Sequence, residues 1–265
     1  MLFLPLFLTL IATISAGSPD CNSIPPTFWC ADEKIISSCG FEDVCARYQK
    51  ATRNEKVNLT ILVEALCPDC QNFIATQLYP VIFKHFNDFV NVELVPFGNA
   101  KLKPDGSIQC QHGEQECYIN KFESCLIDAL RNQTIIIPTI YCIESRLQKK
   151  EEFADAVQAC FEEQKIDFGV QRMTQSCLVS KIGTDLQLAA SKLTSDVWPD
   201  KHSFVPWVIF NGVSLNRAQI LQNEIPTLIC QWYNGDKPIQ YCEAALKKKY
   251  RESSKRVFKD LFLPF

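Results

Sequence analysis

Fourteen cysteines in a chain of 265 residues restrict this protein more than any other feature of its sequence. A cysteine content of about 5% is high for a cytosolic protein, because disulfides persist mainly in oxidising compartments. The even count permits full pairing, but it also permits a few redox-active thiols. The chain is 47% hydrophobic and 22% charged, which is a globular composition. Its pI near 5.7 provides no basic surplus for phosphates and argues against a nucleic-acid partner.

The N-terminus has the pattern of a secretory signal. Residues 2–14 are almost entirely apolar, and the small residues Ser15, Ala16 and Gly17 that follow suit signal peptidase. The apolar run is shorter than the roughly 20 residues that span a bilayer. We predict that residues 1–17 are a signal peptide, and the alternative is a buried N-terminal strand or helix.

The predicted signal peptide directs the protein to the secretory pathway, where it is secreted, lysosomal or both. No later apolar run approaches the length of a transmembrane segment, so we expect a soluble mature protein. Two sequons, at Asn58 and Asn132, agree with this route and are predicted glycosylation sites.

Residues 18–52 form a short cysteine-rich region with many turn-forming residues. About 35 residues cannot bury a sizeable core, so disulfides are expected to hold them together. The spacing of Pro25-Pro26-Thr27-Phe28-Trp29-Cys30 followed by Cys39 and Cys45 resembles a saposin A-type module. A generic disulfide-linked leader is the alternative, and it has the same physical properties. Its four cysteines are Cys21, Cys30, Cys39 and Cys45.

A CxxC motif lies between a strand pattern and a helix pattern. Residues 56–64 are β-branched and apolar, and residues 90–96 form a second strand pattern. Between them, apolar residues recur at helical spacing over residues 72–87, with a kink expected at Pro80. The order predicts a βαβ unit that has the Cys67-Pro68-Asp69-Cys70 motif at the N-terminus of its helix.

This placement suits thiol–disulfide chemistry. The attacking species is a thiolate, and the unpaired N–H groups at a helix N-terminus stabilise it. We therefore predict that Cys67 is the exposed nucleophile and that Cys70, one helical turn further on, resolves the mixed disulfide. Asp69 has two opposed effects: its charge disfavours a thiolate at Cys67, whereas an acid is itself favourable near a helix N-terminus. The sequence leaves the net sign open.

Other interpretations of the CxxC motif are a half zinc site and an inert structural disulfide. A zinc site would draw on Cys110, His112 and Cys117, whose thiols tend to pair in an oxidising lumen. A cysteine protease would need a histidine partner, and sequence order leaves His112 and His202 open for that role. A redox pair is the simplest interpretation. It requires no bound cofactor and no metal.

A run of sixteen residues, Cys110-Gln111-His112-Gly113-Glu114-Gln115-Glu116-Cys117-Tyr118-Ile119-Asn120-Lys121-Phe122-Glu123-Ser124-Cys125, follows the pattern CQHGxxECxxNxxxxC. This run resembles the signature of the gamma-interferon-inducible lysosomal thiol reductase (GILT) family at every fixed position: Cys110, Gln111, His112, Gly113, Glu116, Cys117, Asn120 and Cys125. The resemblance extends to residues 66–70, 95–100 and 205–212 and covers most of residues 57–245. From the residues themselves, His112 is interpreted as a structural hydrogen-bonding group, with a thiol-activating role as the alternative. Cys110, Cys117 and Cys125 are interpreted as structural disulfide partners.

The resemblance implies an α/β, thioredoxin-like fold over residues 53–245, with a disulfide-stapled helical insertion at about 100–200. It implies reduction of disulfide bonds in protein substrates at acid pH, with Cys67 and Cys70 as the active pair and an external small-molecule or protein thiol as the reductant. The family often has small residues between the two cysteines, and Pro68-Asp69 departs from that pattern. An oxidase or isomerase, and a secreted binding module with a structural CxxC, are the alternatives.

Residues 205–212 read as a loop, a strand and a turn. An apolar strand follows Pro206, and Asn211-Gly212 predicts a hairpin turn. Most X–Pro bonds are trans, but the resemblance to thioredoxin-like folds implies a cis bond between Val205 and Pro206, facing the CxxC pair and binding substrate.

Three further expectations concern the remaining segments. The cysteines of the later helices are predicted to form disulfides, with Cys230 and Cys242 as a local pair. The aromatic residues Phe153, Phe161 and Phe168 are predicted to lie in the core. Residues 246–265 form a basic tail, interpreted as a solvated helix end.

Overall fold

The computed structural model describes residues 20–24, 29–30 and 33–244. The predicted signal peptide, the Pro25–Phe28 part of the saposin-like motif and the basic tail at 246–265 lie outside the described residues. The chain divides between Tyr48 and Gln49 into two compact units, which are treated separately below.

The N-terminal unit is held by two disulfides and one aromatic pair. Its described elements are the short 3-10 helix η1 (Cys21–Ser23), α1 (Glu33–Cys39) and most of α2 (Glu42–Ala51). The bonds Cys21–Cys39 and Cys30–Cys45 pair its four cysteines with one another. The rings of Trp29 and Phe41 stack with their centroids 4.6 Å apart. Cross-links therefore supplement a small core, as expected for a segment of this length.

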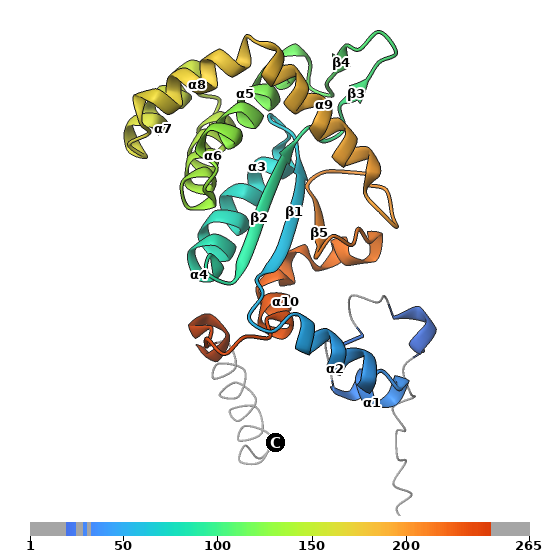
Figure 1. Cartoon of the computed structure of the whole chain (residues 1–265). Helices are drawn as coiled ribbons and strands as arrows, with labels where there is room; N and C mark the ends of the chain where they lie inside the picture. The colour runs from blue at the N-terminus through green and yellow to red at the C-terminus, as the bar shows by residue number, and fades with distance from the viewer. Residues whose placement is uncertain (1–19, 25–28, 31–32, 245–265) are drawn as a thin grey trace, which may run out of the picture. The chain divides into compact units, whose positions relative to one another are not determined.

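A three-stranded sheet of order β2-β1-β5 forms the centre of the larger unit (Figure 1). The strands are β1 (Val57–Val63), β2 (Val90–Pro96) and β5 (Trp207–Phe210), close to the predicted ranges. β2 runs parallel to β1, and β5 runs antiparallel to it. The turn at Asn211 and Gly212 has positive φ at both residues, as a tight hairpin turn of this kind requires.

The crossover from β1 to β2 is helical and begins at the CxxC motif. It consists of α3 (Pro68–Phe73), the π-helical segment η3 (Ile74–Phe83) and α4 (Lys84–Phe86). The helix starts four residues earlier than the predicted Asn72, because a proline at the first helical position leaves no N–H unsatisfied. Pro80 lies inside η3, where the wider π-helical winding accommodates a residue that has no N–H.

Residues 101–196, which include most of the range predicted as a helical insertion, are mainly helical. The helices are α5 (Glu114–Leu130), α6 (Gln133–Gln148), α7 (Phe153–Glu163), α8 (Phe168–Leu178) and α9 (Lys181–Asp196). They follow the two-stranded hairpin of β3 (Lys101–Leu102) and β4 (Ile108–Gln109). α5 and α9 pack against β2, and α6 packs against η3. The insertion thus covers the sheet beside the CxxC helix.

Disulfides account for all cysteines of the larger unit except two. The bonds are Cys110–Cys117, Cys125–Cys177, Cys142–Cys160 and Cys230–Cys242. The last of these joins α10 (Ile225–Trp232), which follows the 3-10 helix η4 (Asn216–Glu224), to the residues after it. Cys67 and Cys70 are the free cysteines. The predicted division into structural cysteines and one thiol pair is confirmed.

The hydrophobic core lies on both sides of the sheet, with Trp207, Phe86, Phe122 and Phe210 among its fully buried side chains. The prediction that Phe168 belongs to this core is wrong, since 68% of the residue is exposed. Phe168 is the first residue of α8, and the guanidinium of Arg172 lies 5.4 Å from its ring centre.

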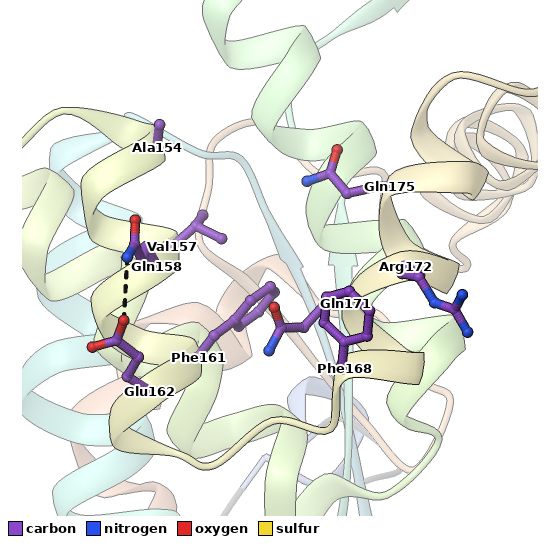
Figure 2. Close-up of a pocket in the computed structure, with 9 residues that line it drawn as sticks. All are labelled: Ala154, Val157, Gln158, Phe161, Glu162, Phe168, Gln171, Arg172 and Gln175. Carbon is purple, nitrogen blue, oxygen red and sulfur yellow. Dashed lines mark hydrogen bonds between the residues drawn. The ribbon is translucent and has the colours of Figure 1, made fainter.

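Phe168 lines an open pocket of about 760 Å³ between α7 and α8 (Figure 2). Figure 2 shows that all of the lining residues come from these two helices, within the insertion. Among the described residues, no helix combines the length and the apolar character that a membrane crossing requires.

Candidate active site

The register of the strands brings three segments to the same end of the sheet. Val63, the last residue of β1, pairs with Pro96, the last residue of β2. In the antiparallel strand, Trp207 pairs with Leu62, so Pro206 also lies at this end. The CxxC turn begins at the same end of the sheet, because it directly follows β1. Residues separated by more than 100 positions in sequence therefore meet there.

The Val205–Pro206 peptide bond is cis, as the family resemblance implied. Both residues are buried, and Gln222 Nε2 donates a hydrogen bond of 2.8 Å to the Pro206 carbonyl. A second cis bond, between Trp198 and Pro199, was not predicted from the sequence. Substrate binding by Val205 and Pro206 stays a prediction.

Cys67 caps the N-terminus of α3, and Cys70 lies in the first turn of that helix. The prediction of an exposed Cys67 is wrong: only 7% of the residue is accessible, and Cys70 is fully buried. The thiol of Cys70 and the N–H groups of Cys70 and Asp69 act on the Cys67 sulfur as hydrogen-bond donors.

These donors lower the pKa of the Cys67 thiol from 9.0 to about 6. The largest cause is the hydrogen bond from the Cys70 thiol, and the N–H groups of Cys70 and Asp69 add to it. Burial and the charge of Asp69 act in the opposite direction. The open question of Asp69 is thus answered for this site: its charge disfavours the thiolate, but the donors outweigh it.

The two thiols are differentiated by their surroundings. Burial and the hydrogen bond to Cys67 raise the pKa of Cys70 far above its usual value. Cys67 therefore ionises at a lower pH than an ordinary thiol, whereas Cys70 keeps its proton to a higher pH. This asymmetry is what an attacking and a resolving cysteine require.

Replacing Asp69 by asparagine tests this balance of charges. We expect a lower pKa for Cys67, because the variant removes a negative charge next to the thiolate. At pH 5 the rate of iodoacetamide alkylation at Cys67 should rise by about two- to fivefold. Asp185→Asn, which removes an exposed carboxylate on α9, is the matched control. An unchanged profile for Asp69→Asn would show that its charge does not act on Cys67.

The signature segment forms a closed loop followed by a helix. The Cys110–Cys117 bond closes the loop, and Gly113 within it has a φ of 90°, which favours glycine, at the start of α5. Gln111 Oε1 accepts a hydrogen bond of 2.7 Å from Asn99 Nδ2. Cys125 ties the helix to α8 through its bond to Cys177. The predicted structural role of the three signature cysteines is confirmed.

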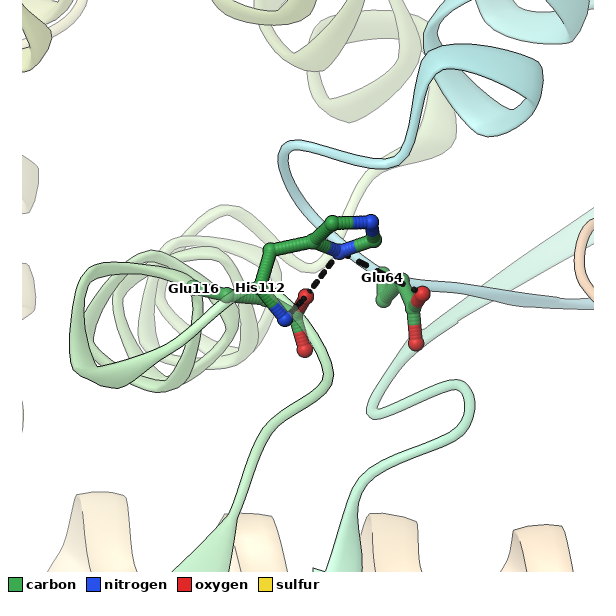
Figure 3. A group of neighbouring side chains, drawn as sticks. All are labelled: Glu64, His112 and Glu116. Atoms are coloured by element: carbon green, nitrogen blue, oxygen red, sulfur yellow. Dashed lines mark hydrogen bonds and ion pairs between the residues drawn. The ribbon is translucent and has the colours of Figure 1, made fainter.

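Glu64, His112 and Glu116 form a cluster beside the CxxC turn (Figure 3). His112 Nδ1 contacts Glu116 Oε2 directly and lies 3.6 Å from Glu64 Oε1. Glu116 also accepts hydrogen bonds from the backbone N–H groups of Gln111 and His112. Both carboxylates are buried, and burial raises the pKa of Glu64 to about 7. His112 thus contacts two buried carboxyl groups, and its role as a structural hydrogen-bonding group stays a prediction.

The same cluster holds the described residues best placed to bind a metal ion, because one potential ligand atom from each residue lies within 4.8 Å of the others. Glu116 Oε2 already accepts hydrogen bonds from the ring and the backbone of His112. The geometry is accounted for by hydrogen bonds and an ion pair.

The other two histidines contribute differently. His85 is exposed on α4 and contacts the ring of Tyr241. His202 is half-buried, and burial lowers its pKa, while it interacts with the backbone of Thr194 and Gly98. The groups that lower the pKa of Cys67 most are the Cys70 thiol and the N–H groups of Cys70 and Asp69, whereas a cysteine protease would require a histidine next to the sulfur.

Sequence patterns did not reveal a pair of buried carboxyl groups behind α3. Glu123 on α5 and Glu144 on α6 are 2% and 1% exposed. Desolvation is the main cause that raises the pKa of both groups, and Glu144 also faces Gln71 of α3 and feels the charge of Cys67. Two adjacent carboxylates are unfavourable in a low-dielectric interior, so burial and mutual repulsion both favour the protonated form of the pair.

This pair predicts an unusual dependence of stability on pH. A carboxyl group whose pKa is raised by folding stabilises the protein below its unfolded pKa of about 4.5, and this contribution is lost as the pH rises through the folded value. We therefore expect a higher Tm at pH 5 than at pH 7.5. Glu144→Gln, which is permanently neutral, should reduce the difference by on the order of 2 kcal/mol in free energy of unfolding.

The exposed variant Glu162→Gln serves as the control in the same thermal-unfolding series, and it should keep the wild-type difference. Equal pH dependence in wild type and Glu144→Gln would show that the pair does not titrate over this range.

The two predicted glycosylation sites are exposed. Asn58 lies within β1, and its side chain accepts a hydrogen bond from Asn91 Nδ2. Asn132 caps the N-terminus of α6 and accepts a hydrogen bond of 2.9 Å from the N–H of Thr134. Glycosylation at either position stays a prediction.

Comparison with known proteins gives a consistent result. The sequence model of the family described as gamma interferon inducible lysosomal thiol reductase (GILT) matches residues 58–164. This range contains the CxxC turn, β2 and the whole signature segment.

Curated relatives match over most of the chain. The gamma-interferon-inducible lysosomal thiol reductase of Carassius auratus is 31% identical over 249 residues, which is 91% of this chain and 94% of that protein. The gamma-interferon-responsive lysosomal thiol protein of Arabidopsis thaliana is 30% identical over 70% of this chain and 74% of its own length. The reductase of Mus musculus is 28% identical over 81% and 83%, respectively.

Proposed function

Because this chain belongs to the gamma interferon inducible lysosomal thiol reductase family, we propose that it is a thiol oxidoreductase that reduces disulfide bonds in protein substrates through Cys67 and Cys70. The observation that carries the proposal is the difference between the two thiols: the pKa of Cys67 is lowered to about 6, and that of buried Cys70 is raised.

The reaction proceeds in two exchanges. The Cys67 thiolate attacks one sulfur of the substrate disulfide, which forms a mixed disulfide and releases the other substrate sulfur as a thiolate that takes up a proton. Cys70 then loses its proton and attacks the sulfur of Cys67, which releases the second substrate thiol. Two electrons pass from the enzyme dithiol to the substrate, and an external thiol reduces the resulting Cys67–Cys70 disulfide.

The lowered pKa supports activity at acid pH. With a pKa of about 6, roughly a tenth of Cys67 is thiolate at pH 5, whereas an ordinary thiol of pKa 8.5 would be almost wholly protonated. Relatives named as lysosomal proteins support an endolysosomal or extracellular setting.

A thioredoxin-like fold is the finer structural proposal. It is supported by the parallel β1–helix–β2 unit with CxxC at the helix N-terminus, by the antiparallel β5 and by the cis-proline that precedes it. In such a fold the backbone at Val205 and Pro206 would bind the substrate peptide next to Cys67.

Oxidation or isomerisation of disulfides is the second candidate. The same lowered pKa favours it, because a stabilised thiolate stabilises the reduced pair and makes the disulfide form a stronger oxidant. Equilibration of the Cys67–Cys70 pair with glutathione buffers of known ratio separates the two directions. A pair that stays mainly in the disulfide form in a reducing buffer has a low reduction potential, so its dithiol form would act as a reductant.

Reduction of insulin at pH 5 and pH 7, with free cysteine as the reductant, tests the proposal. Wild type should accelerate the reaction at both pH values, and Cys67→Ser should leave only the uncatalysed rate. Equal rates for wild type and Cys67→Ser would contradict the proposal and favour a binding module with a structural CxxC.

A further inference from the structure

The turn between β1 and Cys67 has a strained backbone. Leu66, the residue immediately before Cys67, has a φ of 64°. A large non-glycine residue rarely adopts this left-handed conformation, and it persists only where the surrounding structure holds it. The turn, consisting of Glu64, Ala65 and Leu66, determines where Cys67 sits relative to the first N–H groups of α3.

Asn120 of the signature segment holds the middle of this turn. Its Oδ1 accepts a hydrogen bond of 2.8 Å from the N–H of Ala65, in a fully buried position. Among the described residues, its Nδ2 has no hydrogen-bond partner. Asn120 therefore acts on the turn as an acceptor, and the amide nitrogen contributes no bond of its own.

The loop of the signature segment holds the start of the turn. Glu64 Oε2 accepts a hydrogen bond of 2.7 Å from the N–H of Asn99, and Glu64 Oε1 lies 3.6 Å from His112 Nδ1. The side chain of Asn99 is in turn bonded to Gln111, and the ring of His112 to Glu116. Figure 3 shows His112 between the two carboxylates, which come from different segments.

A third residue anchors the helix that carries Asn120. Gln187 of α9 is buried, and its Nε2 donates hydrogen bonds to the Pro96 carbonyl, the Asn120 carbonyl and Ser124 Oγ. These bonds tie α5 to the end of β2 at the level of the CxxC turn. The backbone of Asn120 is thus held by Gln187, while its side chain holds the backbone of Ala65.

We propose that Asn120 is a positioning residue that holds the strained turn before Cys67 in place. The His112–Glu116 pair supports the same turn at its first residue, Glu64. The fixed residues of the signature segment then act on the reaction through the turn, without contacting the substrate. This inference rests on the proposed function for its catalytic consequence, but the position of Cys67 can be measured independently of turnover.

The test compares Asn120→Ala with Asn120→Asp. Alanine removes the acceptor, so the turn should relax and Cys67 should move away from the donors at the start of α3. We expect its alkylation profile to shift to higher pH and kcat for insulin reduction to fall by about tenfold or more, since displacements near 1 Å can have such effects. Aspartate keeps an oxygen acceptor in the same place, and because burial favours its protonated, neutral form, the variant should retain most of both properties at pH 5.

A glycine at position 66 provides a second, independent test. Glycine adopts positive φ without strain, so Leu66→Gly should reduce the effect of Asn120→Ala in the double variant. A purely structural role of Asn120 would predict additive effects instead. If Asn120→Ala does not fold, His112→Ala replaces it, because that side chain is 33% exposed, and a smaller shift in the same direction is expected.

The outcomes separate this inference from the proposed function. If wild type reduces insulin and the alkylation profile of Cys67 is the same in wild type and in the folded variants, the inference is overturned and the proposed function stands. If wild type does not reduce insulin, the proposed function fails, and the alkylation profiles still decide whether Asn120 positions Cys67.

Discussion

Replacing Cys70 by serine is expected to turn the protein from a catalyst into a trap for its substrates. Cys67 can still attack a disulfide, but no second thiol is present in the first turn of α3 to release the product. The variant should therefore accumulate a covalent adduct with insulin, visible as a higher-mass band on a non-reducing gel and lost on reduction. Multiple turnover should fall to near the uncatalysed rate.

The trap also tests the hydrogen bond between the two thiols. The Cys70 thiol is the largest cause of the lowered pKa of Cys67, and a serine hydroxyl can replace it as a donor. Cys70→Ala cannot, so this variant should form the same adduct more slowly at pH 5. The double variant of Cys67 and Cys70 to serine is the control and should form none. An adduct in the double variant would mean that another cysteine reacts.

Removal of the Cys125–Cys177 disulfide is expected to cause the largest loss of stability among the bonds of the insertion. The bond links α5 to α8 across 52 residues of sequence. In the chain-entropy description, a loop of this length contributes about 4 kcal/mol to the free energy of unfolding. Replacing both cysteines by alanine should lower Tm by about 10 °C, measured by thermal unfolding without reductant.

The Cys110–Cys117 bond is the matched comparison, because it closes a loop with a separation of only 7 residues. The same description gives it about 2 kcal/mol. The account predicts that the double alanine variant of Cys125 and Cys177 is the less stable of the two. The opposite order would show that local strain or packing, and not loop length, determines what these bonds contribute.

The parts of the fold that sequence predicted depend on local pattern. Runs of β-branched and apolar residues correctly predicted β1 and β2, whose last three residues are all buried, while polar residues nearer their start, such as Asn58 and Asn91, are exposed. The CxxC motif between them correctly predicted the N-terminus of α3, because the motif lies where the strand pattern ends and the helical pattern begins. The cis bond at Pro206 came from the family resemblance alone.

The parts that sequence did not predict depend on contacts between distant segments. Nothing local to Cys67 indicates that the residue is only 7% exposed. Glu123 and Glu144 look like ordinary polar positions of amphipathic helices, and only the packing of α5 on α6 buries them together. Glu64 gave a weak signal, as an acid that directly follows an apolar strand and precedes the CxxC turn.

The signature segment contains features that the sequence predicted and features that it did not predict. Its pattern identified the family, but the spacing of Glu116 and Asn120 on α5 does not reveal what these side chains contact. In the structure, Asn120 bonds to the backbone of Ala65, 55 residues earlier in the sequence. Such a contact requires the positions of β1 and α5 relative to each other, which no local pattern supplies.

Peptide mapping of the adduct formed by Cys70→Ser with insulin at pH 5 tests the central claim most directly. The account predicts a single cross-linked peptide, in which the sulfur of Cys67 is bonded to an insulin cysteine. A cross-link at any other cysteine, or no adduct in a folded protein, would contradict the assignment of Cys67 as the nucleophile of a thiol reductase.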